Sequence, residues 1–444
     1  MPGAQLEISR ARAAHQLGAH MGRTLKSRSS LLIFGAALVV GFALLTARTV
    51  VRWREMRTVD QIVAAHDIPG AVDFVTSHFR LDKPDGWRAL RRLALSILHQ
   101  GLDDQDPYER CYAATSLVSY GDWTGRPIID SSMVAKDIFL QKAVIEGLAD
   151  ARNAGAVELL GEFYSRGNRF LRVWTAEALA EAGDHHGLPL LLSATASSDE
   201  GIKLWAILGL GRLRDRRVID YLRSLQANET NPLIYAAIAH ALLMLGDRSL
   251  GATELIEVTL YDPNPDRASN AALELGDANY LAAIPQLKSA VRNTNLDLTV
   301  RLAAAAGLTH YGNREGLTLM KTVAADPYTS QTLAPLLLYL DFGISRSLLI
   351  SAMASPNVVL ELAATEAIGR LGNRDEVKIL ADALGHASES IMIAQIAWSL
   401  GRISRLECIP PLIPLLKSSN VTVRYSAAEA LARTATRLLT RGDD

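Results

Sequence analysis

The sequence predicts an all-α protein built as an α-solenoid of helical hairpins. The chain has 444 residues, of which 49% are hydrophobic, so it can bury a large core and is too apolar for disorder. Aromatic side chains make up only 6% of the chain while alanine and leucine are abundant, which favours closely packed helices over sheets. A short turn also recurs at a regular spacing, which is the sequence signature of a repeat architecture.

The recurring turn ends in Asp or Asn, and most copies carry glycine just before that residue. Neighbouring copies lie roughly 30 to 36 residues apart, except for one interval of about twice that length. We interpret the long interval as two periods with one degenerate unit, whose turn is expected near Gly343. The turns SYGD, DARN, EAGD, RLRD, MLGD, ELGD, HYGN and RLGN end at Asp122, Asn153, Asp184, Asp215, Asp247, Asp277, Asn313 and Asn373.

Each repeat combines two helices of different character. The first is rich in alanine, as in residues 171–183, 300–312 and 423–433, with apolar positions three and four apart. The glycine can then adopt the left-handed conformation that ends a helix, and the Asp or Asn can cap the second helix. Because one hairpin cannot bury its apolar face alone, neighbouring units are expected to stack into a rod or superhelix.

The first helices resemble HEAT repeats, particularly the short bacterial form also found in phycobilisome lyases. The pattern VRxxAAxAL is present almost unchanged at Val423 to Leu431, and in weaker form at Val300 to Leu308 and Leu171 to Leu179. The resemblance covers Asp106 to Arg437 and implies about ten HEAT-like helical hairpins.

The same resemblance implies a ladder of charged residues through the stack. In that family the arginine of the first helix and the acid of the turn often bond to each other. The corresponding residues here are Arg172, Arg301, Arg424, Asp122, Asp184 and Asp247. The resemblance gives these residues a structural role rather than a catalytic one.

A transmembrane helix is expected at residues 31–51, ahead of the solenoid. Leu31 to Ala47 reads LLIFGAALVVGFALLTA, an uncharged run of about 17 residues with basic residues on both sides. A cleaved secretory signal and a buried core helix are the alternatives. The long basic stretch before the run and the poor cleavage site at Leu45 to Ala47 disfavour the first, and the lack of a polar face disfavours the second.

The resulting organisation has five parts: a basic tail (1–30), the transmembrane helix (31–51), a helical linker and cap (52–105), the solenoid (106–437) and a polar tail (438–444). Arginine and lysine flank the span on both sides almost equally, so orientation rests on the cost of moving the basic tail across a membrane. That cost favours a body on the periplasmic side of a bacterial inner membrane over a cytoplasmic one.

No motif for catalysis is found, and no cofactor, metal or catalytic residue is expected. Walker, GxSxG, HExxH and dinucleotide-binding patterns are absent from the sequence. Cys111 and Cys408 are far apart and are expected to be buried thiols, and His240 is expected to be a hydrogen-bonded core residue. Deoxyhypusine hydroxylases resemble this fold but need His-Glu pairs for iron, and the chain has no His-Glu dipeptide.

A basic cluster at Arg212, Arg214, Arg216 and Arg217 is a possible contact for a partner. Nucleic acid is disfavoured, because the body carries net negative charge and few aromatic side chains for stacking. The sequence therefore predicts a membrane-anchored scaffold or assembly subunit that binds other proteins and is not an enzyme. The alternative is a chromophore lyase or assembly chaperone similar to phycobilisome lyases.

Overall fold

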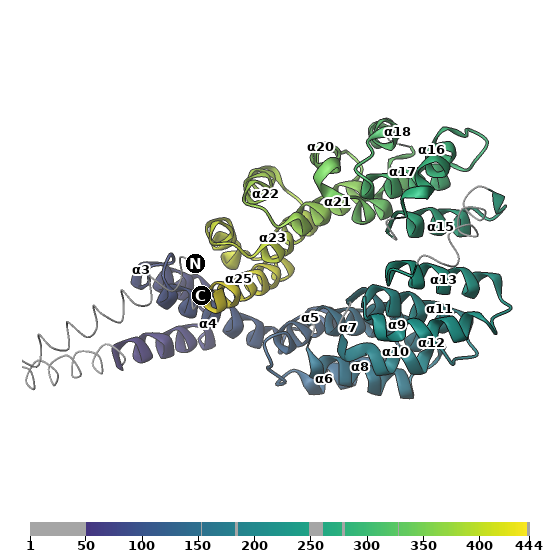
Figure 1. Cartoon of the computed structure of the whole chain (residues 1–444). Coiled ribbons are helices and arrows are strands. Elements are labelled where there is room, and N and C mark those ends of the chain that lie inside the picture. Colours follow the sequence, from purple (N-terminus) through teal and green to yellow (C-terminus); the bar gives the residue numbers. More distant parts are fainter. Residues whose placement is uncertain are drawn as a thin grey trace, which may run out of the picture. The chain divides into compact units, whose positions relative to one another are not determined.

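The computed structural model describes residues 50–151, 153–182, 185–247, 261–277, 280–326 and 328–441 (Figure 1). Contacts divide the chain into a first unit, Met1–Gln61, and a second unit, Ile62–Asp444. In the first unit, residues 50–61 are helical, and an ion pair of 2.7 Å joins the guanidinium of Arg52 to the carboxylate of Glu55 one turn later.

The predicted basic tail and residues 31–49 of the predicted transmembrane helix lie outside the described residues. Among the helices that are described, none combines the length and the apolarity that a bilayer crossing requires.

All regular structure in the described part of the second unit is helical, as predicted, and it forms two rows. The inner row consists of helices stacked side by side, and the outer row covers them. The inner helices are α5 (Pro107–Val118), α7 (Ile138–Ala151), α9 (Arg169–Ala182), α11 (Glu200–Arg212), α13 (Pro232–Met244), α15 (Pro265–Asp277), α17 (Leu298–His310), α21 (Val358–Leu371), α23 (Ser390–Ile403) and α25 (Val421–Arg441).

The outer helices complete the hairpins. They are α6 (Arg126–Met133), α8 (Ala154–Arg166), α10 (Leu188–Ala194), α12 (Ile219–Gln226), α16 (Ile284–Arg292), α18 (Glu315–Ala325), α20 (Phe342–Ala352), α22 (Arg374–His386) and α24 (Ile409–Leu412). The segment that follows α13 includes residues 248–260, which lie outside the description. The described elements thus agree with the expected stack of about ten hairpins.

Small residues on the inner row allow neighbouring backbones to approach closely. A Cβ atom added to Gly276 of α15 would lie 2.4 Å from the Cα atom of Gly307 in α17, so neither helix can carry a larger side chain at this point. Ala303 to Ala306 of α17 are fully buried. The alanine-rich pattern in the sequence therefore has the packing role that was predicted for it.

The glycine turns also have the predicted conformation. Gly121, Gly246, Gly312 and Gly372 have φ values of 76°, 86°, 69° and 72°, in the left-handed region that ends a helix. Asn313 then accepts a hydrogen bond of 2.9 Å from the backbone N–H of Glu315 at the start of α18. The turns at Gly121, Gly312 and Gly372 each reverse the chain between an inner and an outer helix.

The degenerate unit lies where the doubled interval placed it. Its inner element is a four-residue helix, α19 (Ser330–Leu333), followed by the 3₁₀ helix η4 (Ala334–Tyr339). Pro335 in the first turn of η4 lacks the N–H that a continuous α-helix would use. The turn that follows contains Leu340 and Asp341, two residues before the expected position at Gly343.

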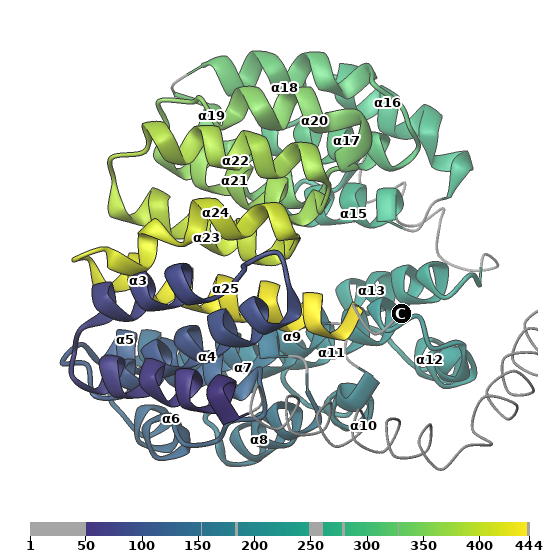
Figure 2. The same ribbon diagram turned by 90° about the vertical axis from the view of Figure 1, so that its left-hand side faces the viewer.

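The stack of the second unit closes on itself, whereas the sequence predicted a rod or superhelix that begins at a terminal cap. Helix α4 (Pro84–Gly101), part of the predicted cap, packs along the final helix α25, and helix α3 (Ile68–His78) packs beside α4 (Figures 1 and 2). Closure has a physical reason, because α4 presents a row of buried leucine and isoleucine side chains rather than a polar end face. Helix α25 continues to Arg441, so residues 438–441 are helical and not a tail.

Side chains from distant parts of the sequence join the two ends. The Tyr112 hydroxyl of α5 donates a hydrogen bond of 3.0 Å to the carboxylate of Glu429 in α25, which is only 5% exposed. The Arg91 guanidinium of α4 donates to the Thr436 hydroxyl at 3.0 Å. We call this region the closure.

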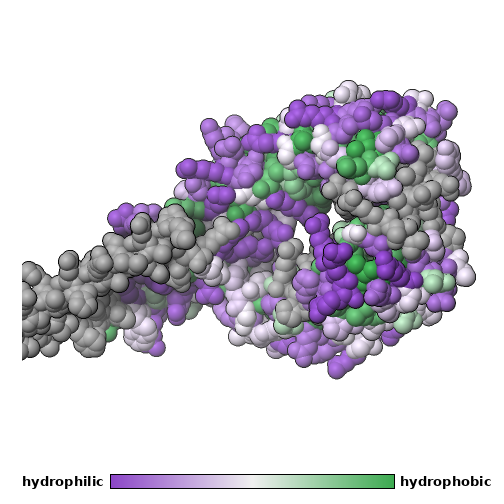
Figure 3. All heavy atoms as spheres, viewed as in Figure 1, coloured by the Kyte–Doolittle hydropathy of each residue, from purple (hydrophilic) through white to green (hydrophobic). Residues whose placement is uncertain are grey.

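The contact between α13 and α15 is less extensive than the contacts on either side of it, between α11 and α13 and between α15 and α17. We call it the seam. It separates a first arc, α4 to α13, from a second arc, α15 to α25. In the space-filling view an opening bordered by hydrophilic side chains remains between the two arcs (Figure 3).

Candidate functional site

Among the described residues, none of the three ladder arginines pairs with a turn acid. Arg301 and Arg424 are each the fourth residue of an inner helix, and their guanidinium groups donate to carbonyl oxygens of the preceding segment, Val291 at 3.1 Å and Ser418 at 2.7 Å. These carbonyls lie at the C-terminal end of an outer element, where helical partners are missing. In these two helices the cation therefore caps the preceding outer element instead of pairing with an acid.

Arg110 makes the same contact and was missed by sequence reasoning. It is the fourth residue of α5, and its guanidinium donates to the carbonyl oxygen of Asp104 at 2.6 Å. Its place as the fourth residue of an inner helix, shared with Arg301 and Arg424, could have identified Arg110 from the sequence. Arg172 occupies the fourth position of α9, but its exposed side chain contacts no acid among the described residues.

The turn acids bind other groups. Asp122 accepts a hydrogen bond of 3.0 Å from the backbone N–H of Thr124 and lies 2.8 Å from the imidazole Nε2 of His99. Asp247 is buried and accepts from the guanidinium of Arg223 in α12 at 2.7 Å. Asp184 lies outside the described residues.

The structure separates the four arginines of the predicted basic cluster. Arg217 pairs with the Asp215 carboxylate through several hydrogen bonds, and this contact lowers the pKa of Asp215 to about 2. Arg214 and Arg216 are exposed on the turn. Arg212, at the end of α11, lines a cavity at the seam. The cluster is thus one neutralised ion pair, two solvated cations and one cavity residue.

An exposed apolar patch lies where α5 and α7 begin. Val134 and Phe139 are 83% and 67% exposed, and Ile138 and Tyr108 beside them are also exposed. The Tyr108 hydroxyl donates to the Asp137 carboxylate at 2.9 Å, and Asp137 also accepts from the Phe139 backbone N–H at 3.0 Å. Asp137 therefore holds the two helix ends together. We call Tyr108, Val134, Ile138 and Phe139 the edge patch.

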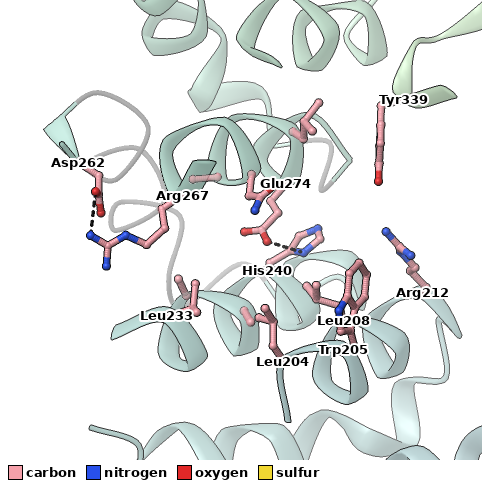
Figure 4. A pocket seen from close by; sticks show the side chains of 15 residues that line it. Leu204, Trp205, Leu208, Arg212, Leu233, His240, Asp262, Arg267, Glu274 and Tyr339 are labelled. Carbon is pink, nitrogen blue, oxygen red and sulfur yellow. Dashed lines mark hydrogen bonds and ion pairs between the residues drawn. The ribbon is translucent and has the colours of Figure 1, made fainter. Parts of the chain in front are cut away.

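The seam contains a cavity of about 140 Å³. Apolar residues of α11 and α13 line one side, α15 contributes Asn270, Ala271 and Glu274, and Tyr339 reaches it from η4. Figure 4 shows the labelled side chains around this space. Both arcs thus contribute to one cavity.

His240 of α13 is buried, as predicted, but it is not hydrogen-bonded. It is 4% exposed, and neither ring nitrogen has a hydrogen-bond partner in the described structure. Its Nδ1 atom lies 3.7 Å from the Glu274 carboxylate, too far for a hydrogen bond. Burial lowers the pKa of the His240 imidazole to about 3, with a smaller contribution from Arg212, so the ring is neutral.

In the described part of the chain, the cysteines and the other metal-ligating side chains form no reactive or metal-binding group. Cys111 and Cys408 are buried free thiols, as predicted, and burial raises the pKa of each to about 11. The described residues contain no group of three His, Cys, Asp or Glu side chains arranged to hold a metal ion.

Comparison with known proteins identifies the repeat type. A family model described as HEAT repeats matches residues 165–243, and a second, described as HEAT repeat, matches residues 408–438. A search of the curated proteins found no match.

Several solved structures are similar to parts of the chain. The complex of CpcE and CpcF of phycocyanin lyase from Nostoc sp. PCC7120 is 17% identical, with 52% of this chain and 92% of that chain covered and a TM-score of 0.36. Human deoxyhypusine hydroxylase is 20% identical, with 58% and 99% covered and a TM-score of 0.29. Kap121p is 14% identical, with 82% and 48% covered and a TM-score of 0.31. TM-scores this low carry no information on function, whereas the matched models show that the chain contains HEAT repeats.

Proposed function

We propose that this chain is a non-enzymatic scaffold that binds another protein through the edge patch. The observation that carries the proposal is the exposure of Val134 and Phe139 beside Ile138 and Tyr108 on one rigid corner of the stack. Single exposed apolar side chains are ordinary on protein surfaces, but a contiguous group marks an interaction site.

The edge patch is suited to binding because its backbone is fixed. Asp137 links the start of α5 to the start of α7 through hydrogen bonds to Tyr108 and Phe139, so little ordering is needed when a partner docks. Large side chains such as Phe139 and Tyr108 bury much area on binding and commonly dominate the energy of an interface.

The proposal includes a membrane setting, which rests on the sequence. The uncharged run from Leu31 to Ala47 with its basic flanks is the support for an anchor, and the basic tail is the support for a periplasmic body. The expected partner is accordingly a subunit of a membrane protein complex.

The test is a mild-detergent purification of the tagged full chain from native membranes. We expect one protein to co-purify in a fixed ratio, and we expect the double variant Val134→Asp with Phe139→Asp to lose it. Tyr328→Asp is the matched control, because Tyr328 is also a large exposed side chain but lies in the second arc. Equal recovery of the partner by all three proteins would contradict the role of the patch. Recovery of the wild-type chain alone would favour a transient chaperone or lyase activity.

A further inference from the structure

We propose that the seam cavity is a binding site for a carboxylate attached to an apolar group of about the size of one benzene ring. The inference is independent of the edge patch and of protein binding. It rests on the size of the cavity, on its apolar wall and on polar groups that have no partner.

The size of the cavity sets the size of the apolar group. An engineered apolar cavity of about 150 Å³ accepts benzene, and the seam cavity has a volume of about 140 Å³. Leu204, Trp205 and Leu208 of α11 form one wall, with Ala237 and Ala271 beside them. This wall offers contact area to an aromatic or branched aliphatic group.

Arg212 and Tyr339 set the charge of the ligand. Figure 4 shows the Arg212 guanidinium and the Tyr339 hydroxyl pointing toward each other across the cavity, one from α11 and the other from η4. No hydrogen bond or ion pair joins the side chain of either to a described residue. The other guanidinium of the lining, Arg267, is already paired with Asp262 at 3.0 Å. A carboxylate between Arg212 and Tyr339 would accept hydrogen bonds from both.

His240 borders the cavity with its ring. Both ring nitrogens are buried and make no hydrogen bond in the described structure, so the ring contributes to the wall and the polar contacts of the ligand come from Arg212 and Tyr339. Glu274 lies on the other side of the ring from Arg212 in Figure 4, so its negative charge is turned away from the position proposed for the carboxylate.

A ligand in this position would contact both arcs. Trp205, Arg212 and His240 belong to the first arc, whereas Tyr339 and Ala271 belong to the second. Because α13 and α15 contact each other little, a bound ligand would add a large share of the contacts across the seam. Binding should therefore slow hydrogen exchange in α13 and α15.

The test is calorimetry of the purified full chain with 3-phenylpropionate, its uncharged amide, and acetate. We expect one site with a dissociation constant on the order of 1 mM for 3-phenylpropionate, and binding at least about tenfold weaker for the amide and for acetate. A short peptide ending in phenylalanine with a free carboxylate, compared with its C-terminal amide, tests whether the natural source is a peptide end or a free acid.

Two variants locate the site. Arg212→Gln should weaken binding of 3-phenylpropionate about tenfold, whereas Arg216→Gln, an exposed neighbour on the same turn, should leave it unchanged. Ala271→Leu, which fills the cavity and removes no charge, should abolish binding. Hydrogen exchange in α13 and α15 should slow with ligand only in the proteins that bind. The proposal is overturned if wild type binds no aryl carboxylate, or if Arg212→Gln and Ala271→Leu bind it as wild type does.

Discussion

The closure and the seam are the two places where the stack departs from ordinary repeat-to-repeat packing, and they do so in opposite ways. At the closure, α4 lies along α25, and hydrogen bonds from Tyr112 and Arg91 reach residues more than 300 positions away in the sequence. At the seam, neighbours in the sequence contact each other little and leave a cavity with an unpartnered His240. Distance along the chain therefore does not predict how tightly two elements pack.

The comparison predicts that core truncation costs more at the closure than at the seam. Leu93→Ala in α4 should lower the free energy of unfolding by about 3 kcal/mol, because Leu93 is fully buried and its removal leaves a cavity. Leu204→Ala at the seam should cost about 1 kcal/mol, since Leu204 already borders an empty space. Urea unfolding measures the free energy of unfolding of both variants. Equal losses would contradict the difference between the two regions.

The seam should also make stability depend on pH. Unfolded histidine takes up a proton near its ordinary pKa of about 6.5, whereas folded His240 resists protonation until about 3. Stability is therefore full above about pH 6.5 and falls as the pH drops toward 3, by about 2–3 kcal/mol at pH ~4.5. His240→Leu should remove this part of the loss, and His386→Gln, at an exposed histidine, should not. Denaturant unfolding above about pH 6.5 and at pH ~4.5 measures the free energy of unfolding of each protein. Identical pH profiles for His240→Leu and wild type would contradict this prediction.

Hydrogen bonds at the closure should contribute a smaller amount. Tyr112→Phe keeps the ring but removes the hydroxyl that donates to Glu429, so we expect a loss of about 1 kcal/mol in the free energy of unfolding. Tyr328→Phe, at an exposed tyrosine, is the control and should change nothing measurable. A neutral Tyr112→Phe would show that this hydrogen bond does not stabilise the closure.

The smallest effect on stability is expected at the edge patch. Val134→Asp with Phe139→Asp should change the free energy of unfolding by no more than about 0.5 kcal/mol per site, because both side chains are exposed. Thermal unfolding followed by circular dichroism compares the stability of the double variant with that of wild type. A large loss would mean that the patch is part of the fold and not a binding surface.

The repeat architecture could be predicted from the sequence because each hairpin is specified by nearby residues. The left-handed turn at Gly312, the cap by Asn313 and the alanine-rich face of α17 all lie within one period. The same holds for the degenerate unit, whose turn fell two residues from its expected position. Local signals repeated along a chain give both the elements and their order.

The closure and the site could not be predicted in this way. Whether α4 ends the stack or meets α25 depends on the small rotation added at each repeat, which no single turn encodes. His240 and Arg212 were noticed, one as a core residue and the other as part of a charged cluster, but their common cavity also needs Tyr339 from the degenerate unit. Arg301 and Arg424 were placed correctly on their helices, and only the geometry showed that carbonyl oxygens are their partners.

The most direct test of the closed stack is a distance measurement between spin labels at Arg88→Cys in α4 and Thr440→Cys in α25. Both positions are exposed, and the native Cys111 and Cys408 are buried with raised pKa values, so they should not take up label. A closed stack predicts one narrow distribution at short distance in pulsed electron resonance. A broad distribution at distances that span several repeats would show an open solenoid and contradict the account.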